Sequence, residues 1–136
     1  DWYLGRGNPL ELWREAEVMA CLLFHFRPAT KKRHNNFGRT PFETREYQYL
    51  LGTLAENESQ RDPLSCELGL ALTYYLHSGN HPDTDNILKA VKDSFNGVIY
   101  EDDEQVIFDI NGIVRVDNNI SEALEILVLR GPSNNN

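Results

Sequence analysis

The sequence predicts an α+β domain: a small mixed β-sheet of about four strands with two main helices packed on it. Four segments are rich in apolar and β-branched residues and are bounded by polar stretches, as strands are. Two other segments repeat apolar residues at helical spacing. The helices connect strands by crossings that favour some parallel pairing, so a mixed sheet with helices mainly on one face is the economical arrangement.

In the first half of the chain, residues 9–17 are expected to form a short helix. The continuous apolar run from Val18 to Phe26 predicts a buried strand, which Arg27-Pro28 ends. Residues 29–39 are basic and polar without periodicity and predict a loop. Thr40-Pro41 is typical of a helix start, and the apolar residues that follow predict a helix ending near Asn57.

In the second half, residues 68–76 alternate between apolar and polar positions and predict a half-buried strand. Residues 106–116 predict a strand that continues, bent or bulged, through Asn111-Gly112. Residues 124–129 predict the last strand. The connection between these two strands is short, which favours an antiparallel pair.

Between those strands, an apolar residue at every fourth position from Ile87 to Phe95 predicts a helix of about three turns. Asp83 or Asp85 can cap its first turn, because a short carboxylate accepts hydrogen bonds from free backbone N–H groups. Asn96-Gly97 supplies the helix end, since glycine adopts the left-handed conformation at little cost.

Length and composition fit one soluble domain over residues 1–136, with residues 1–17 as an N-terminal extension and residues 131–136 as a disordered tail. Hydrophobic residues make up 40% and charged residues 25% of the chain. No apolar run approaches the roughly 20 residues that a membrane helix needs, so no membrane partner is expected. Cys21 and Cys66 lie in apolar runs and predict buried, reduced thiols, which fits a cytoplasmic protein acting on nucleoid DNA.

The net charge of −8 is unevenly distributed. Between residues 27 and 45, six basic residues face one acidic residue, so this segment carries 6 − 1 = +5 and the remainder −13. Charges are screened over roughly 8–10 Å at physiological salt, so a local basic segment can attract phosphate despite the global sign. The alternative is a solvated basic loop. The candidate DNA-binding residues are Arg27, Lys31, Lys32, Arg33, Arg39 and Arg45.

Acidic residues cluster on both sides of the helix predicted from the apolar pattern of residues 87–95. Asp83 and Asp85 precede it, and the run 101–104, Glu-Asp-Asp-Glu, follows it. Lys89 lies four residues after Asp85 and shares its polar face. A helical hairpin that returned the second cluster to the first would make a carboxylate pocket containing one lysine.

Carboxylates gathered in one pocket repel one another and need protonation, a neighbouring cation or a metal ion. Oxygen ligands without histidine or cysteine favour Mg²⁺, with Mn²⁺ as a possible substitute, and such an ion supports hydrolysis of a phosphodiester. Lys89 would steady a phosphate as a point charge. The alternative is a helix with capping aspartates beside an unrelated acidic loop. A calcium-binding EF-hand is excluded, because a loop counted from Asp83 puts Leu88 where glycine is needed.

The stretch PDTDNILKAVKDSFNGVIYEDDEQV resembles the RusA family of Holliday junction resolvases. In that family an Asp-x-Asp-Asn run, a lysine four residues on, a helix ending in an aspartate and an Asn-Gly turn, and an Asp-Asp pair before a strand recur together. The resemblance extends from about Phe24 to Leu129, since the basic loop, Gly38-Arg39-Thr40 and the following helix keep the family's order. Most of its specificity lies in residues 83–106.

The resemblance implies a Mg²⁺-dependent homodimeric endonuclease that cuts four-way DNA junctions in recombination and repair. It places the metal ligands and catalytic carboxylates on Asp83, Asp85 and Asp103, with Asp102 and Asp93 in supporting acidic positions. It places the catalytic lysine on Lys89. No organic cofactor is implied.

The sequence departs from the family in two places. Residues 1–17 precede the family's usual first strand, and Arg115 stands near the position of a later lysine. Two other functions stay open: a branched-DNA-binding protein of the same fold without catalysis, and a negatively charged surface that serves a protein partner.

Overall fold

A computed structural model describes residues 9–25, 52–53, 62–81 and 83–131. In these ranges a short helix, α1 (Pro9–Arg14), precedes strand β1 (Val18–Phe24). Strand β2 (Leu68–Leu76), helix α3 (Thr84–Phe95) and the short 3₁₀ helix η2 (Asp103–Gln105) follow. Strands β3 (Val106–Arg115) and β4 (Ala123–Arg130) complete the described elements. The α+β class and the four-stranded mixed sheet predicted from the sequence are confirmed.

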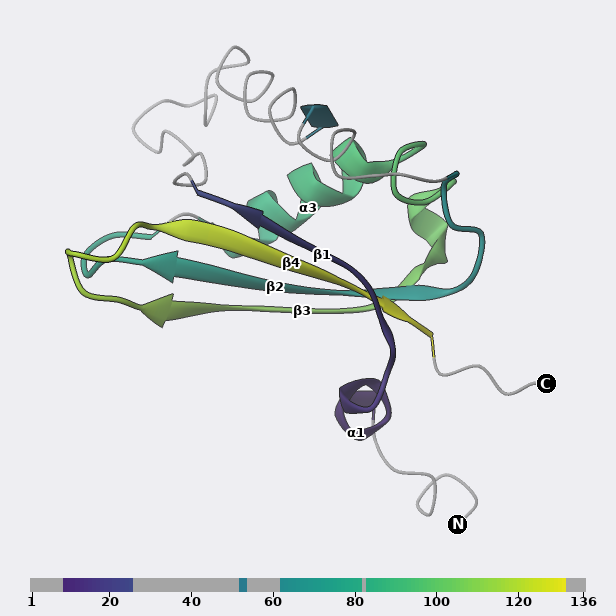
Figure 1. The fold of residues 1–136 in the computed structure, drawn as a ribbon, viewed down its shortest axis with the longest axis horizontal. Coiled ribbons are helices and arrows are strands. Elements are labelled where there is room, and N and C mark those ends of the chain that lie inside the picture. Colours follow the sequence, from purple (N-terminus) through teal and green to yellow (C-terminus); the bar gives the residue numbers. More distant parts are fainter. Residues whose placement is uncertain (1–8, 26–51, 54–61, 82, 132–136) are drawn as a thin grey trace.

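The strand order is β1-β4-β2-β3. Strand β4 pairs antiparallel with both β1 and β2, while β2 and β3 run parallel and are connected through α3. The expected antiparallel pair between the last two strands is therefore wrong, because β4 crosses β2 and inserts between β2 and β1 (Figure 1). The parallel pairing expected from the helix crossing is present.

The hydrophobic core lies between the sheet and α3. Alternate residues of β2 point into it, from Leu68 through Leu70, Leu72 and Tyr74 to Leu76, and all are buried. Helix α3 contributes its expected apolar face, whose buried residues are Ile87, Ala90, Val91 and Phe95. Burying side chains of this size stabilises the fold by about 1.5–3 kcal/mol for each large apolar residue. The core therefore fixes α3 against the sheet.

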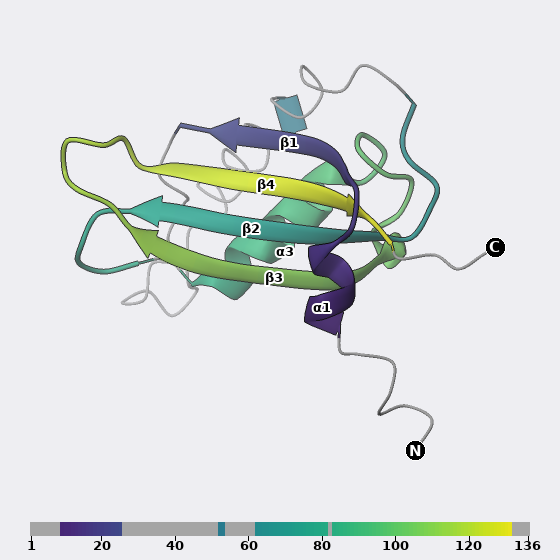
Figure 2. The same ribbon diagram turned by 60° about the horizontal axis from the view of Figure 1, so that its bottom comes forward.

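Helix α1 lies on the opposite face of the sheet from α3, so the helices do not share one face (Figures 1 and 2). Trp13 is buried and stacks on Phe108 of β3, with ring centroids 5.1 Å apart and planes at 7°. A Cβ at Gly69 would lie 2.7 Å from the Trp13 ring, so only glycine allows this approach. Part of the N-terminal extension thus packs on the sheet.

An apolar groove of about 500 Å³ lies between α1 and this sheet face, lined by residues that include Leu10, Ala71, Ile110 and Leu127. Cys21 belongs to the same strand face as Leu23 and is exposed, and Cys66 is half-buried, so the expected burial of both thiols is wrong. Both are free cysteines, as predicted.

Several expectations concern parts of the chain outside the described residues. They are the basic loop with its six candidate DNA-binding residues, the tail after Gly131 and most of the helix predicted after Thr40, of which Gly52 and Thr53 are helical. In the described part of the chain, no helix is long and apolar enough to cross a membrane.

Candidate active site

Helix α3 begins at a capping aspartate. The Asp83 Oδ1 atom accepts hydrogen bonds from the backbone N–H groups of Asp85 (3.0 Å) and Asn86 (3.4 Å). These are two of the N–H groups that a helix leaves without an internal partner, so the sequence requires a short polar residue here. The cap fixes the Asp83 carboxylate at the positive end of the helix dipole, which favours a negative charge.

The other acidic residue of this end, Asp85, is exposed in the first turn of α3. Lys89 is exposed one turn later and makes no ion pair with a described carboxylate. The Nδ2 atom of Asn86 is buried and has no hydrogen-bond partner among the described residues. The start of α3 therefore presents two carboxylates, with an ammonium group one turn further along the helix.

The helix ends as the sequence predicts. Asn96 is its C-terminal cap, and Gly97 has a φ of 76°, in the left-handed region that glycine tolerates. The Tyr100 hydroxyl donates to the Lys92 carbonyl at 2.8 Å, and the ring of Tyr100 packs edge-on against Phe95 at 6.3 Å. These contacts hold the segment after α3 against the last turn of the helix.

The second acidic cluster lies in η2, just before β3. Asp102 caps η2: its Oδ1 accepts from the Glu104 N–H at 2.9 Å, and its own N–H donates to Gln105 Oε1 at 2.8 Å. The Gln105 Nε2 atom also donates to the carbonyls of Leu64 and Cys66. Asp102 is thus occupied in holding the turn, whereas the half-buried Asp103 side chain has no hydrogen-bond partner among the described residues.

Two buried tyrosines show where the carboxylates lie. Burial raises the pKa of Tyr74 above its usual range, and the charges of Asp85 and Asp83 raise it further. Burial also raises the pKa of Tyr100, with additional contributions from Asp103, Asp93 and Asp102. The Tyr74 hydroxyl donates to the Thr84 carbonyl at the start of α3, at 3.2 Å, whereas Tyr100 lies at its end. The two acidic groups therefore surround different tyrosines.

The topology explains this separation. Asp83 and Asp85 follow the C-terminal end of β2, whereas Asp103 precedes the N-terminal end of β3. Because β2 and β3 are parallel neighbours, these points lie at opposite ends of the sheet (Figure 1). Helix α3, with 12 residues, spans about 18 Å between them.

In the described part of the chain, no three His, Cys, Asp or Glu side chains come close enough together to hold a metal ion. The expectation that the chain would fold its second acidic cluster back onto the first is therefore wrong for the single chain. Asp83 and Asp85 both raise the pKa of Tyr74, whereas Asp103, Asp93 and Asp102 raise that of Tyr100.

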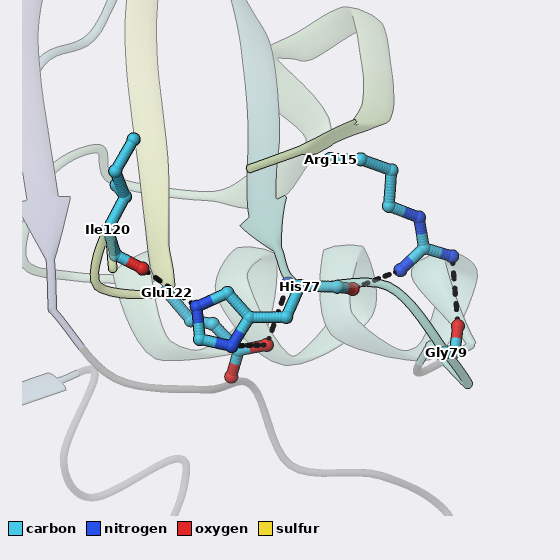
Figure 3. Close-up of polar contacts among 5 residues, drawn as sticks. All are labelled: His77, Gly79, Arg115, Ile120 and Glu122. Atoms are coloured by element: carbon cyan, nitrogen blue, oxygen red, sulfur yellow. Dashed lines mark hydrogen bonds and ion pairs between the residues drawn. The ribbon is translucent and has the colours of Figure 1, made fainter. Parts of the chain in front are cut away.

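Near the first acidic group, three residues that were not predicted as a unit anchor the loop after β2 (Figure 3). The His77 backbone N–H donates to Glu122 Oε2 at 2.9 Å, and its ring Nε2 donates to the Ile120 carbonyl at 2.7 Å. Arg115 donates to the carbonyls of His77 and, at 3.0 Å, Gly79. The sequence places Arg115 only near the position of the family's later lysine. Its contacts join residues about 38 positions apart, which no local pattern reveals.

Comparison with known proteins decides the family. Residues 25–119, more than half of the chain, match the family model described as Endodeoxyribonuclease RusA. The chain belongs to the RusA family. RusA proteins are endodeoxyribonucleases that hydrolyse phosphodiester bonds, act on Holliday junctions in recombination and generally depend on a divalent metal ion. The chain matches none of the curated proteins with which it was compared. RusA membership confirms the resemblance, the nuclease activity and the branched-DNA partner predicted from the sequence.

The raised tyrosine pKa values predict the behaviour of this RusA chain at alkaline pH. Unfolded tyrosine ionises near pH 10, and burial and nearby carboxylates keep Tyr74 and Tyr100 neutral above that pH in the folded chain. Their contribution to stability is therefore complete below pH 10 and is lost as the pH rises further. Through the raised pKa of each tyrosine, the free energy of unfolding should fall by about 1.4 kcal/mol for every pH unit above pH 10.

Urea unfolding between pH 8 and pH 11 measures this dependence. The Tyr74→Phe and Tyr100→Phe variants should each show a shallower decline than the wild-type chain, whatever their stability at pH 8. Equal declines in all three proteins would contradict the assignment of the raised pKa values.

Proposed function

We propose that this chain resolves four-way junctions as a Mg²⁺-dependent homodimer, with Asp83, Asp85 and Asp103 as the metal ligands and Lys89 as the catalytic cation. The observation that carries the proposal is that two clusters of acidic residues lie at opposite ends of α3. In each cluster one aspartate already caps a helix. The caps are Asp83, through one oxygen, and Asp102. Among the described residues, neither the Asp85 nor the Asp103 carboxylate has a hydrogen-bond partner, so both oxygens of each are open to a ligand there.

The donor set fits Mg²⁺. All the candidate ligands are carboxylate oxygens, which a hard cation prefers, and neither acidic group contains a histidine or a cysteine. Two or three uncompensated carboxylates at one point repel one another, and a divalent cation offsets that repulsion. When bound, Mg²⁺ supplies an activated water and stabilises negative charge on the phosphate. Mn²⁺, with the same ligand preference, is a possible substitute.

A homodimer accounts for the separation of the two groups. A two-fold axis perpendicular to α3 places the start of the helix in one chain beside the end of the helix in the other. Each site then takes Asp83 and Asp85 from one chain and Asp103 from the second, and symmetry generates two identical sites. A four-way junction has approximate two-fold symmetry and needs cuts in two opposed strands, so two such sites match it.

The other proposed roles follow from charge. Lys89 is exposed on the same helix as Asp85 and would hold a non-bridging phosphate oxygen or the leaving group. The basic segment between Arg27 and Arg45 would hold the junction arms through phosphate contacts, which makes binding strongly salt-dependent. Cytoplasmic action on nucleoid DNA is part of the same proposal.

A cleavage assay tests the proposed function. The protein is incubated with four-way, three-way and linear DNA of matched sequence, in Mg²⁺, in Mn²⁺ and in a chelator, and sedimentation equilibrium measures its mass. We expect paired nicks in the four-way junction only with metal, and a dimer. A protein that shifts the junction without nicking it would instead be a binding protein of the same fold, and failure to bind junctions at low salt would contradict both.

A further inference from the structure

Arg115 is the last residue of β3 and pairs in register with Leu76, the last residue of β2. It is exposed, but its guanidinium group turns towards the loop after β2 (Figure 3). One terminal nitrogen donates to the His77 carbonyl and the other, at 3.0 Å, to the Gly79 carbonyl. The planar fork of the guanidinium group therefore spans two carbonyls of one loop, which a lysine ammonium cannot do in the same geometry.

The same loop is held from a second direction. Glu122, just before β4, accepts the His77 backbone N–H at 2.9 Å, and its carboxylate lies 3.6 Å from the His77 ring Nδ1. The ring Nε2 donates to the Ile120 carbonyl at 2.7 Å. A carbonyl oxygen only accepts, so the ring must carry its proton on Nε2. His77 is thus fixed between the end of β3 and the turn that leads into β4.

This anchored loop leads directly into the first acidic group. Gly79 has a φ of 111°, a left-handed backbone that turns the chain towards α3, and Asp83 follows four residues later as the helix cap. Metal ligands need fixed backbones, because groups that orient the ligands control metal affinity and activity. The core and the Tyr74 hydroxyl hold α3 itself, whereas the described hydrogen bonds of Asp83 are all with its own helix. The anchored loop is therefore the described segment that holds the chain on the N-terminal side of Asp83.

We infer that Arg115 is a positioning residue: by holding the His77 and Gly79 carbonyls it fixes the entry of the chain into α3, and with it the Asp83 and Asp85 carboxylates. The inference rests on the proposed function, because it assigns these carboxylates to the metal. It differs from a contact with DNA, the other role open to a basic residue near the position of the family's later lysine. The two carbonyls take one N–H from each terminal nitrogen of the guanidinium group and orient the group towards the loop.

The test compares Arg115→Ala and Arg115→Lys with the wild-type protein. Arg115→Ala should lower kcat at saturating junction by about 10- to 100-fold and raise the Mg²⁺ concentration for half-maximal cleavage. Its junction Kd should stay within about twofold of wild type, with an unchanged salt slope, because no phosphate contact is lost. Arg115→Lys should recover only part of kcat, since an ammonium group lacks the planar fork that spans the two carbonyls.

Arg130→Ala is the matched control. Arg130 is also the exposed last residue of a strand, but it pairs with Glu17 at 3.2 Å and lies opposite Leu68, at the other end of the sheet. Arg130→Ala removes one positive charge, as Arg115→Ala does, and should leave kcat and the Mg²⁺ dependence of cleavage unchanged. A weaker junction Kd, a smaller salt slope and an unchanged kcat in Arg115→Ala would show a DNA contact and overturn the inference.

Hydrogen exchange provides a readout that needs neither DNA nor turnover. Arg115→Ala should accelerate exchange of the His77 and Asp85 amides several-fold, while the amides of β1 and β4 keep wild-type rates. Unchanged exchange at both amides would overturn the inference. Because this measurement is independent of cleavage, it decides the role of Arg115 even if the wild-type protein leaves junctions uncut, a result that would contradict only the proposed function.

Discussion

The Asp83→Asn variant is expected to lose Mg²⁺-dependent cleavage of four-way junctions and to keep junction binding. The substitution removes one negative charge and one metal-binding oxygen at the start of α3. Asparagine caps helices about as well as aspartate, so the two hydrogen bonds to the Asp85 and Asn86 N–H groups can persist and the fold should stay intact. We expect the cleavage rate to fall by about 1,000-fold or more, as removal of an essential catalytic group does.

Single-turnover cleavage and gel-shift titrations of the same junction measure the two properties separately. Asp117→Asn is a suitable control, because Asp117 is also an exposed aspartate beyond the C-terminal end of the parallel pair and the charge change is identical. It should cut at the wild-type rate. Cleavage by Asp83→Asn at a similar rate would remove Asp83 from the metal site.

The local features of the fold were predictable from the sequence because neighbouring residues determine them. The cap at Asp83, the apolar face of α3 and the end at Gly97 depend on contacts within one or two helical turns. The alternation in β2 reports burial on one face of a strand. Each of these patterns has a physical cause within about ten residues, and each is confirmed.

The order of the strands was not predictable from connection length. A short connection favours a hairpin, but burial determines the result here. In β4, Leu124, Ile126 and Val128 are fully buried and few residues are exposed, so this strand gains most in the middle of the sheet. Strand β3 carries Asp109 and Asn111 and many exposed positions, which suits an edge. Comparing the polarity of the two strands would have indicated this order.

The members of the candidate site could be proposed from spacing and resemblance, but their separation follows from topology. Once β2 and β3 are parallel, the residues after β2 and before β3 must lie at opposite ends of the sheet. The sequence predicts that a helix joins parallel strands, and such a connection by itself places the two acidic clusters at opposite ends of the sheet. The loop contacts of His77, Arg115 and Glu122 had no such signal, because they arise only when distant strand ends meet.

Mixing two inactive variants is expected to restore nicking. If each site takes Asp83 and Asp85 from one chain and Asp103 from the other, a heterodimer of Asp83→Asn and Asp103→Asn chains has one site with both substitutions and one with neither. That heterodimer should nick one strand of the junction. In an equal mixture half of the dimers are heterodimers, so about a quarter of all sites should be intact. Chains are co-refolded, and nicked and fully resolved products are separated on denaturing and native gels.

A mixture of Asp83→Asn with Asp85→Asn is the matched control, because both substitutions fall in the same half of the site and every site in the heterodimer then carries one of them. This mixture should stay inactive. If one chain instead supplied all three carboxylates after a rearrangement, neither mixture would nick DNA, because each chain would carry its own defective site. Restoration in the first mixture and not in the second therefore requires a site shared between two chains, which the separation of Asp83 and Asp103 along α3 leads us to expect.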